Sequence, residues 1–378
     1  MFELDKKQVK LGLLASLAVF ALVLIALKPH LPTAVYHNFA AIDDYKIFQN
    51  RIVKRGSPAP WTEAQQKKRP PSESTGDLLR KLDTTALLML QDGKIVFEEY
   101  SQDGGETVLS GSFSMAKSIV ALLAGFALQD GRIKSIEEPV ARYLPEWEGR
   151  EEGKIRIQDL LRMTAGLDWN ESYINPFSIT TEAYYGTNLL STVFKQHRIE
   201  EPGTKFSYQS GTTQLLGTLV SRAVNSPLAE YASVKLWSPL GAERDALWSL
   251  DHENGNEKAY CCFNATARDF ARIGELVRNQ GSWAGQALLD PNFISEMVRP
   301  HRIPNSEGSL VDYYGYQWWI LRTPKGDVPY ARGILGQYIV VIPWNQRVIV
   351  RLGKSTGERT DHHPIELRAL VEWGLESS

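Results

Sequence analysis

The sequence is poor in cysteine. Only two cysteines are present among 378 residues, and they are neighbours, Cys261 and Cys262. Adjacent cysteines cannot bridge distant parts of a chain, so a disulfide framework is excluded. Two cysteines are also too few for a closed zinc site unless histidines complete it. We therefore expect two partly buried thiols that serve in packing.

An excess of positive charge is also missing. Lysine and arginine number 42 against 44 aspartates and glutamates, which gives a formal net charge of −2. Binding to nucleic acid needs a clear basic excess or a basic stripe, so nucleic acid is not an expected partner. Apolar residues make up 43% of the chain and charged residues 23%, as in a globular protein with a sizeable core.

The N-terminus departs from this average composition. Residues 11–27 are apolar or small and carry no charge, and Lys6, Lys7 and Lys10 precede them. Seventeen helical residues extend about 26 Å, which is the short end of a bilayer crossing. Basic residues ahead of the apolar run favour a cytoplasmic N-terminus. We predict that residues 1–28 form an uncleaved signal-anchor, a single-pass transmembrane helix in the inner membrane.

Two alternatives to the signal-anchor stay open. A cleaved signal peptide has a shorter apolar region that ends in a small-x-small site, and no convincing site follows closely here. A buried apolar hairpin is the other alternative. With an anchor, the rest of the chain lies on the periplasmic, extracytoplasmic side of the membrane.

Residues 29–77 have the composition of a tether and lead-in. They include the polar, proline-bearing stretch at 67–76, which offers little apolar surface to bury. We expect them to have little structure of their own, and we expect one globular domain at 78–378.

The domain mixes strands and helices. Residues 85–100 predict a β-hairpin around an Asp-Gly turn, and residues 114–131 predict a buried helix that ends at glycine. Strands return at 316–351, before a last helix that begins at Pro364. The pattern favours an α+β fold in which both ends of the chain form one antiparallel sheet, flanked by helices, with an α-helical lobe inserted.

The sequence Ser-Met-Ala-Lys at 114–117 carries the first chemical signal. Side chains three residues apart share one face of a helix, so Ser114 and Lys117 can form a hydrogen bond. A serine hydroxyl is a poor nucleophile unless a neighbour takes its proton, and burial can lower the pKa of a lysine enough for that role. The alternative is that Ser114 is only the N-cap of the helix.

Two later segments offer partners for this pair. Tyr208 lies in a serine- and glycine-rich turn before an apolar helix, and a tyrosine close to a lysine can share the work of a general base. Gly333 precedes an apolar strand, where glycine often marks the close approach of another backbone. If that strand edges the site, the amides of Ile334 and Ser114 can form an oxyanion hole.

Taken in order, these segments resemble the penicillin-recognising serine hydrolases, from about residue 80 to about residue 375. This superfamily includes class C β-lactamases, DD-peptidases, certain esterases and 6-aminohexanoate-dimer hydrolases. Residues 114–117 match its Ser-x-x-Lys element, residues 157–167 its segment of the form LLtMtSGl, and Tyr208 the tyrosine of its Tyr-x-Asn element.

The resemblance implies that Ser114 attacks a carbonyl while Lys117 and Tyr208 manage its proton. The amides of Ser114 and Ile334 then hold the oxyanion, and water hydrolyses the acyl-enzyme. No metal or cofactor is implied.

The chain also departs from the family at two elements. Ser210 stands where β-lactamases keep asparagine, and residues 331–333 read Ala-Arg-Gly in place of Lys-Thr-Gly. Both elements help β-lactamases bind their substrate, so their loss disfavours β-lactam recognition, although Arg332 still offers a positive charge. The loop at 171–176 is most similar to the 6-aminohexanoate-dimer hydrolases, where a loop tyrosine contacts the amide. Tyr173 is the matching position; a packed loop tyrosine is the alternative.

We therefore expect a membrane-anchored serine hydrolase, an esterase or amidase, that acts on a small-molecule ester or amide. A weak β-lactamase or DD-peptidase is the alternative within the enzyme class. A ligand-binding or sensor protein of the same fold is the alternative outside it.

Overall fold

The computed structural model describes residues 6–376, apart from some side chains of the first helix. Its centre is a six-stranded antiparallel sheet in the order β11-β12-β13-β14-β2-β3. The bounds are β2 (Thr84–Gln91), β3 (Lys94–Tyr100), β11 (Trp319–Thr323), β12 (Gly326–Gly333), β13 (Gln337–Ile342) and β14 (Arg347–Gly353). Strand β14 pairs with β2, with Ile349 opposite Met89, so both ends of the chain build one sheet, as predicted.

The sheet is covered by helices on both faces, because its side chains alternate between two apolar clusters. Val348 and Val350 belong to the larger cluster, with α4 and α10, whereas Ile349 between them belongs to a second cluster, with α3 and α12. These helices are α3 (Glu73–Lys81), α4 (Met115–Gln129), α10 (Ala267–Arg278) and α12 (Ile365–Leu375). The antiparallel sheet flanked by helices confirms the predicted α+β fold.

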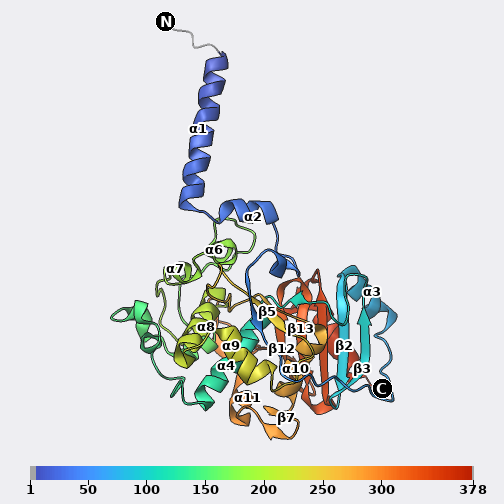
Figure 1. The fold of residues 1–378 in the computed structure, drawn as a ribbon. Helices are drawn as coiled ribbons and strands as arrows, with labels where there is room; N and C mark the ends of the chain where they lie inside the picture. Colours follow the sequence, from blue (N-terminus) through green and yellow to red (C-terminus); the bar gives the residue numbers. More distant parts are fainter. Residues whose placement is uncertain (1–5, 377–378) are drawn as a thin grey trace.

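A helical lobe lies beside this sheet (Figure 1). It contains α5 (Ile157–Leu161), α6 (Ile179–Tyr185), α7 (Leu189–Val193), α8 (Ser210–Val224) and α9 (Leu228–Ala232). A four-stranded sheet accompanies the lobe, with β1 (Asn50–Val53), β5 (Ala246–Ser249), β6 (Phe263–Ala265) and β4 (Ser110–Gly111) in that order. Shorter elements are β7 (Ser282–Trp283), β8 (Gln286–Ala287), α11 (Pro291–Met297), β9 (Ile303–Pro304), β10 (Leu310–Val311), β15 (Arg359–Thr360) and β16 (His363–Pro364).

Helix α4 is the central helix of the domain. Every residue from Met115 to Ala127 is buried, because the helix packs against α8 on one side and the main sheet on the other. The chain turns away at Gly131, whose φ of 67° suits glycine, so the predicted helix and its end are confirmed. Helices α4 and α8 both begin at the junction between lobe and sheet, with Ser114 just before α4 and Ser210 first in α8.

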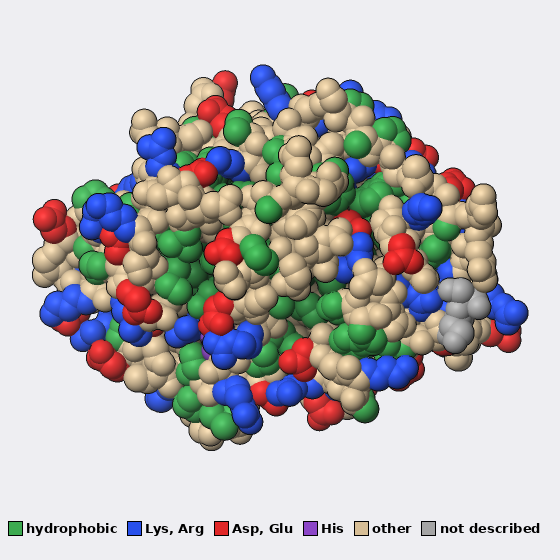
Figure 2. Space-filling model, turned by 90° about the horizontal axis from the view of Figure 1, so that it is seen from below, with side chains coloured by type: hydrophobic (Ala, Val, Ile, Leu, Met, Phe, Trp, Pro, Cys, Tyr) green, Lys and Arg blue, Asp and Glu red, His purple; other side chains and the backbone are tan. Residues whose placement is uncertain are grey.

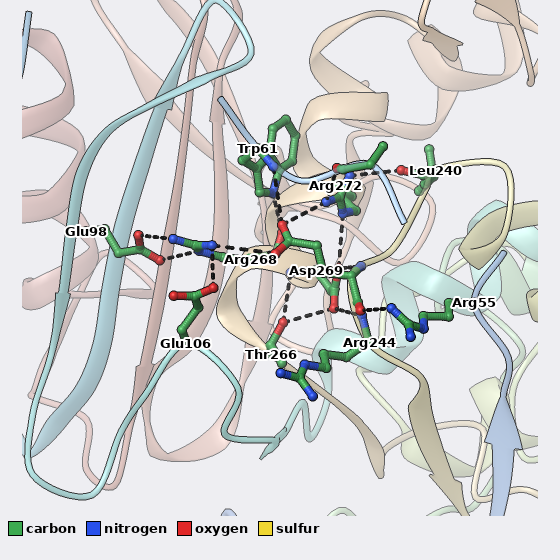
Figure 3. A network of polar contacts seen from close by, with 12 residues as sticks. Arg55, Trp61, Glu98, Glu106, Leu240, Arg244, Thr266, Arg268, Asp269 and Arg272 are labelled. Carbon is green, nitrogen blue, oxygen red and sulfur yellow. Dashed lines mark hydrogen bonds and ion pairs between the residues drawn. The ribbon is translucent and has the colours of Figure 1, made fainter. Parts of the chain in front are cut away.

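A polar network fixes α10 to its surroundings (Figure 3). The buried Asp269 carboxylate accepts hydrogen bonds from the amides of Glu243 and Arg244 at 2.7 and 3.1 Å, and from Arg272 Nε at 3.0 Å. The Arg268 guanidinium donates two hydrogen bonds of 2.7 Å to Glu98 on β3. The start of α10 is thereby tied both to the main sheet and to the chain ahead of β5.

The lead-in at 29–77 differs from the predicted tether. It contains α2 (Leu31–His37), β1 and the first turns of α3, and β1 pairs with β5 of the domain. Arg272 Nη2 donates to the Ala59 carbonyl at 2.7 Å, and Trp61 Nε1 donates to the Arg268 carbonyl at 2.9 Å. The segment is ordered because the domain supplies the partners that its own composition lacks. The division into 1–28, 29–77 and 78–378 itself stays a prediction.

Helix α1 (Lys6–Leu27) stands away from the body of the molecule (Figure 1). Over the part of the chain that the structure describes, no helix has the length and apolarity that a membrane crossing requires. The structure thus gives no support to the transmembrane helix predicted within residues 1–28.

The two cysteines also differ from the prediction. Cys261 and Cys262 are joined by a disulfide, whereas free thiols were expected. Both are buried in the main apolar cluster, so their predicted packing role is confirmed. The bond links neighbours and closes no distant loop, because the two sulfurs come from consecutive residues of one buried segment.

Figure 2 shows the face of the molecule that lies away from α1. Acidic and basic side chains are interspersed over it, in agreement with the near-neutral net charge.

We expect Asp269→Ala to lower the free energy of unfolding by about 3–5 kcal/mol. The change removes one of the two carboxylates that face the buried Arg272 guanidinium and leaves the amides of Glu243 and Arg244 without their acceptor. Urea denaturation measures this loss. The matched control is Glu106→Ala in the same network, where the side chain is 52% exposed. An exposed pair contributes only about 0–1 kcal/mol, and equal losses from both variants would contradict the role given to Asp269.

Candidate active site

Ser114 stands at the entrance to α4 in a strained stretch of backbone. Phe113 just before it has a φ of 44°, a conformation that non-glycine residues rarely adopt and that gathers at functional sites. The Ser114 side chain makes no capping hydrogen bond to the helix. Its Oγ instead accepts a hydrogen bond from Lys117 Nζ at 3.0 Å. The structure therefore favours the serine–lysine pair over the simple N-cap.

Lys117 is a buried amine held by three oxygens. Its Nζ donates to Ser114 Oγ, Ser210 Oγ and the Tyr260 carbonyl, each at 3.0 Å, and the residue is 1% exposed. Burial lowers its pKa to about 8, and the charge of Glu171 opposes this shift. At pH 7 about one molecule in ten then has a neutral amine, against about one in 2,500 at the ordinary pKa of about 10.4. Lys117 is thus a usable base for the Ser114 hydroxyl.

Tyr208 joins the pair from the turn before α8. Its ring centroid lies 5.1 Å from Lys117 Nζ. Burial and the nearby charge of Glu171 raise the pKa of Tyr208, against the smaller effect of the Ser114 side chain, which lowers it. The phenol therefore stays protonated near neutral pH. In this protonated form Tyr208 can relay a proton to or from a reacting group, whereas a base would need the deprotonated tyrosinate.

Glu171 is the residue of the site that the sequence analysis missed. Its carboxylate accepts hydrogen bonds from the Ser210 hydroxyl at 2.5 Å, the Ser210 amide at 2.7 Å and Trp169 Nε1 at 2.7 Å. The Tyr173 hydroxyl is a fourth donor. The available signal was an acidic residue two positions before Tyr173, but a loop without periodicity gives no means of placing it.

Glu171 also decides what Ser210 can do. A serine hydroxyl has one proton, and that of Ser210 is directed to Glu171. Its oxygen is then left to accept from Lys117. Ser210 therefore serves as an acceptor for the lysine, whereas the amide group of an asparagine also has donors that can face a substrate.

Gly333 brings the end of β12 against the nucleophile segment. A Cβ added at this glycine would lie 2.2 Å from the Ser112 carbonyl oxygen, so only glycine fits. Ile334, the next residue, lines the same cavity as Ser114. The close backbone approach predicted at this glycine is confirmed.

Of the two remaining predicted site residues, Tyr173 lines the cavity and Arg332 does not. Tyr173 is 45% exposed and lines the cavity beside Ser114, with its hydroxyl on Glu171. Arg332 is not among the lining residues; its guanidinium lies 4.2 Å from the Trp319 ring centroid, and its Nη1 donates to the His362 carbonyl. The same Trp319 ring also packs against the Tyr208 ring, with the two ring centroids 5.3 Å apart.

A serine that accepts a hydrogen bond from a buried lysine, at the start of a helix beside an antiparallel sheet, defines the Ser-x-x-Lys class of serine hydrolases. The family model described as beta-lactamase matches residues 77–372, and the chain belongs to this family. Its relatives are hydrolases, and so is this chain.

The chain is also similar to individual proteins in sequence and in fold. A curated 6-aminohexanoate-dimer hydrolase from Paenarthrobacter ureafaciens is 26% identical over 321 residues, which cover 78% of this chain and 80% of that protein. A solved structure from Bacillus anthracis, provisionally named a 6-aminohexanoate-dimer hydrolase, matches with a TM-score of 0.75 and 23% identity over 86% of this chain and 89% of its own. A family VIII carboxylesterase matches with a TM-score of 0.63 and 16% identity over 82% and 98% of the two chains.

We expect Glu171→Gln to move the acidic limb of the pH–activity profile to lower pH. Lys117 can act as a base only when its amine is neutral, so we expect activity to rise as the pH passes its pKa of about 8. The charge of Glu171 raises that pKa, and glutamine removes the charge while keeping an acceptor for Ser210. Values of kcat/KM from pH 5 to 10 measure the limb. Glu201→Gln, at a side chain that is 72% exposed, is the control, and an unchanged limb in Glu171→Gln would contradict the coupling.

Proposed function

We propose that this protein is an esterase or amidase that hydrolyses its substrate through an acyl-enzyme on Ser114. The observation that carries the proposal is the hydrogen bond of 3.0 Å between Ser114 Oγ and the buried Lys117 amine, whose pKa is lowered to about 8. Burial of the amine supplies a base within reach of the nucleophile.

The first half of the reaction forms the acyl-enzyme. Neutral Lys117 takes the hydroxyl proton as Ser114 Oγ bonds to the carbonyl carbon, and the carbonyl oxygen becomes an oxyanion. The amides of Ser114 and Ile334 hold this oxyanion at the entrance to α4, where the helix field favours negative charge. The bond to the leaving group then breaks, and the Lys117 proton reaches the departing oxygen or nitrogen through the Tyr208 hydroxyl.

The second half repeats these steps with water. A water molecule gives one proton to the base and its oxygen to the acyl carbon, and the oxyanion forms again. Collapse breaks the bond to Ser114 Oγ, which recovers its proton from Lys117, and the carboxylic acid leaves. Atoms and charges balance without any other reactant.

The polar groups around the nucleophile bear on the choice of substrate. Ser210 gives its only proton to Glu171, and the Arg332 guanidinium lies over the Trp319 ring and donates to the His362 carbonyl, so neither supplies the contacts that β-lactamases use for the amide and carboxylate of their substrates. This supports a simple ester or linear amide over a β-lactam. The name of the P. ureafaciens relative makes linear amides of amino acids one candidate.

The location of the protein is a separate matter. Lys6, Lys7 and Lys10 ahead of the apolar residues 11–27 support an extracytoplasmic domain attached to the inner membrane. This location stays a prediction from the sequence.

We expect intact-protein mass spectrometry to find an acyl adduct after brief mixing with a short p-nitrophenyl ester, and none in Ser114→Ala. Lys117→Ala should also lose the adduct, because among the described residues the Lys117 amine is the basic group hydrogen-bonded to the Ser114 hydroxyl. A separate reaction with a penicillin tests the β-lactamase alternative. A stable penicilloyl adduct would favour the penicillin-binding branch, and no adduct from either compound would favour a ligand-binding protein.

A further inference from the structure

The nucleophile opens into a cavity of about 280 Å³. Ser114, Ser210 and Tyr173 line it, and Asn38, Thr180 and Thr181 are further polar residues of its wall. Most of the wall is nevertheless apolar, and no lining residue among those described is aspartate, glutamate, lysine, arginine or histidine.

The lead-in supplies one wall of this cavity. Ala34 and Val35 of α2, and Phe39 just after that helix, line the cavity together with Ile334 and Leu335. The mouth is apolar as well, since Val35 is 69% exposed and Phe39 is 66% exposed. The lead-in at 29–77, whose composition predicted a linker, therefore contributes to the wall of this cavity.

Polar contacts hold this wall in place. Lys28 Nζ pairs with Glu182 Oε2 at 2.8 Å, and His30 Nε2 lies 3.1 Å from the Pro176 carbonyl oxygen. Helix α2 packs on α6, and the His37 and Tyr185 rings stack at 6.1 Å. Both ends of α2 are thereby fixed over the cavity.

The charged groups of Glu171 and Lys117, beside the cavity, already have hydrogen-bond partners within the protein. Both oxygens of Glu171 are taken by the donors from Ser210, Trp169 and Tyr173. Lys117 is buried next to Ser114, and its Nζ donates hydrogen bonds to three oxygens. A charged group that entered the cavity would lose its water without meeting an opposite charge, which is strongly unfavourable.

We propose that this cavity binds an uncharged, apolar acyl group, so that the substrates are esters or amides of apolar carboxylic acids. This inference rests on the proposed acyl-enzyme chemistry at Ser114. It places acids that carry a terminal ammonium or carboxylate outside the preferred class.

Three p-nitrophenyl esters of nearly equal length test the inference. The heptanoyl, 6-aminohexanoyl and adipoyl esters end in a methyl group, an ammonium group and a carboxylate. Each value of kcat/KM is corrected for spontaneous hydrolysis. We expect the heptanoyl ester to exceed both others by about tenfold or more, because only its end group enters an apolar wall without loss of hydration. Equal values, or a preference for either charged ester, would overturn the inference.

A matched pair of variants locates the selectivity on the lead-in. Val35→Asp places a carboxylate at the cavity mouth, whereas Val234→Asp changes an equally exposed valine that does not line the cavity. The exposed fractions are 69% and 68%, so neither change disturbs the core. We expect Val35→Asp to lower the ratio of heptanoyl to 6-aminohexanoyl activity by about tenfold and Val234→Asp to leave it unchanged. An unchanged ratio in both variants would contradict the placement of the acyl group against α2.

Titration with a small fluorophosphonate separates failure of this inference from failure of the proposed function. Labelling of Ser114 without any acyl selectivity would leave the hydrolase in place and remove the apolar acyl site. Failure of Ser114 to label, with no ester turned over, would remove both.

Discussion

The burial of one amine organises the site. Lys117 Nζ is held by oxygens from three parts of the chain: Ser114 before α4, Ser210 at the start of α8, and the Tyr260 carbonyl before β6. An ammonium ion in such a place has lost its water, so its proton is held more weakly. The packing of α4 between α8 and the main sheet therefore sets the chemistry of the serine, because it keeps water from the lysine.

Glu171 balances this burial. Its charge raises the pKa of Lys117 and so limits the shift that burial causes. Through Ser210 it also fixes the direction of one hydrogen bond, since that hydroxyl donates to the carboxylate and accepts from the amine. The serine that replaces the asparagine of β-lactamases is thus part of a consistent arrangement that includes the glutamate. Ser210 and Glu171 are therefore best understood together.

The sequence predicted the parts of the molecule that local patterns govern. The long apolar run after Ser114 specified a buried helix, the Asp-Gly turn specified the hairpin of β2 and β3, and Gly333 marked a close backbone approach. It could not predict the order in the lead-in, because Asn50–Val53 finds its partner strand about 200 residues later. Glu171 was missed for the same reason, since its role depends on Ser210 from another element. The oxidised state of Cys261 and Cys262 has no signature in spacing.

The central claim is that Lys117 is a weakened ammonium that serves as the base for Ser114. The most direct measurement is an NMR titration of the lysine side chains in the intact protein, with the Lys117 signal assigned by its absence in Lys117→Ala. Lys258 needs the same assignment, because burial lowers its pKa to about 7. The account predicts a pKa near 8 for Lys117. A value near 10.4, as in an exposed lysine, would contradict it.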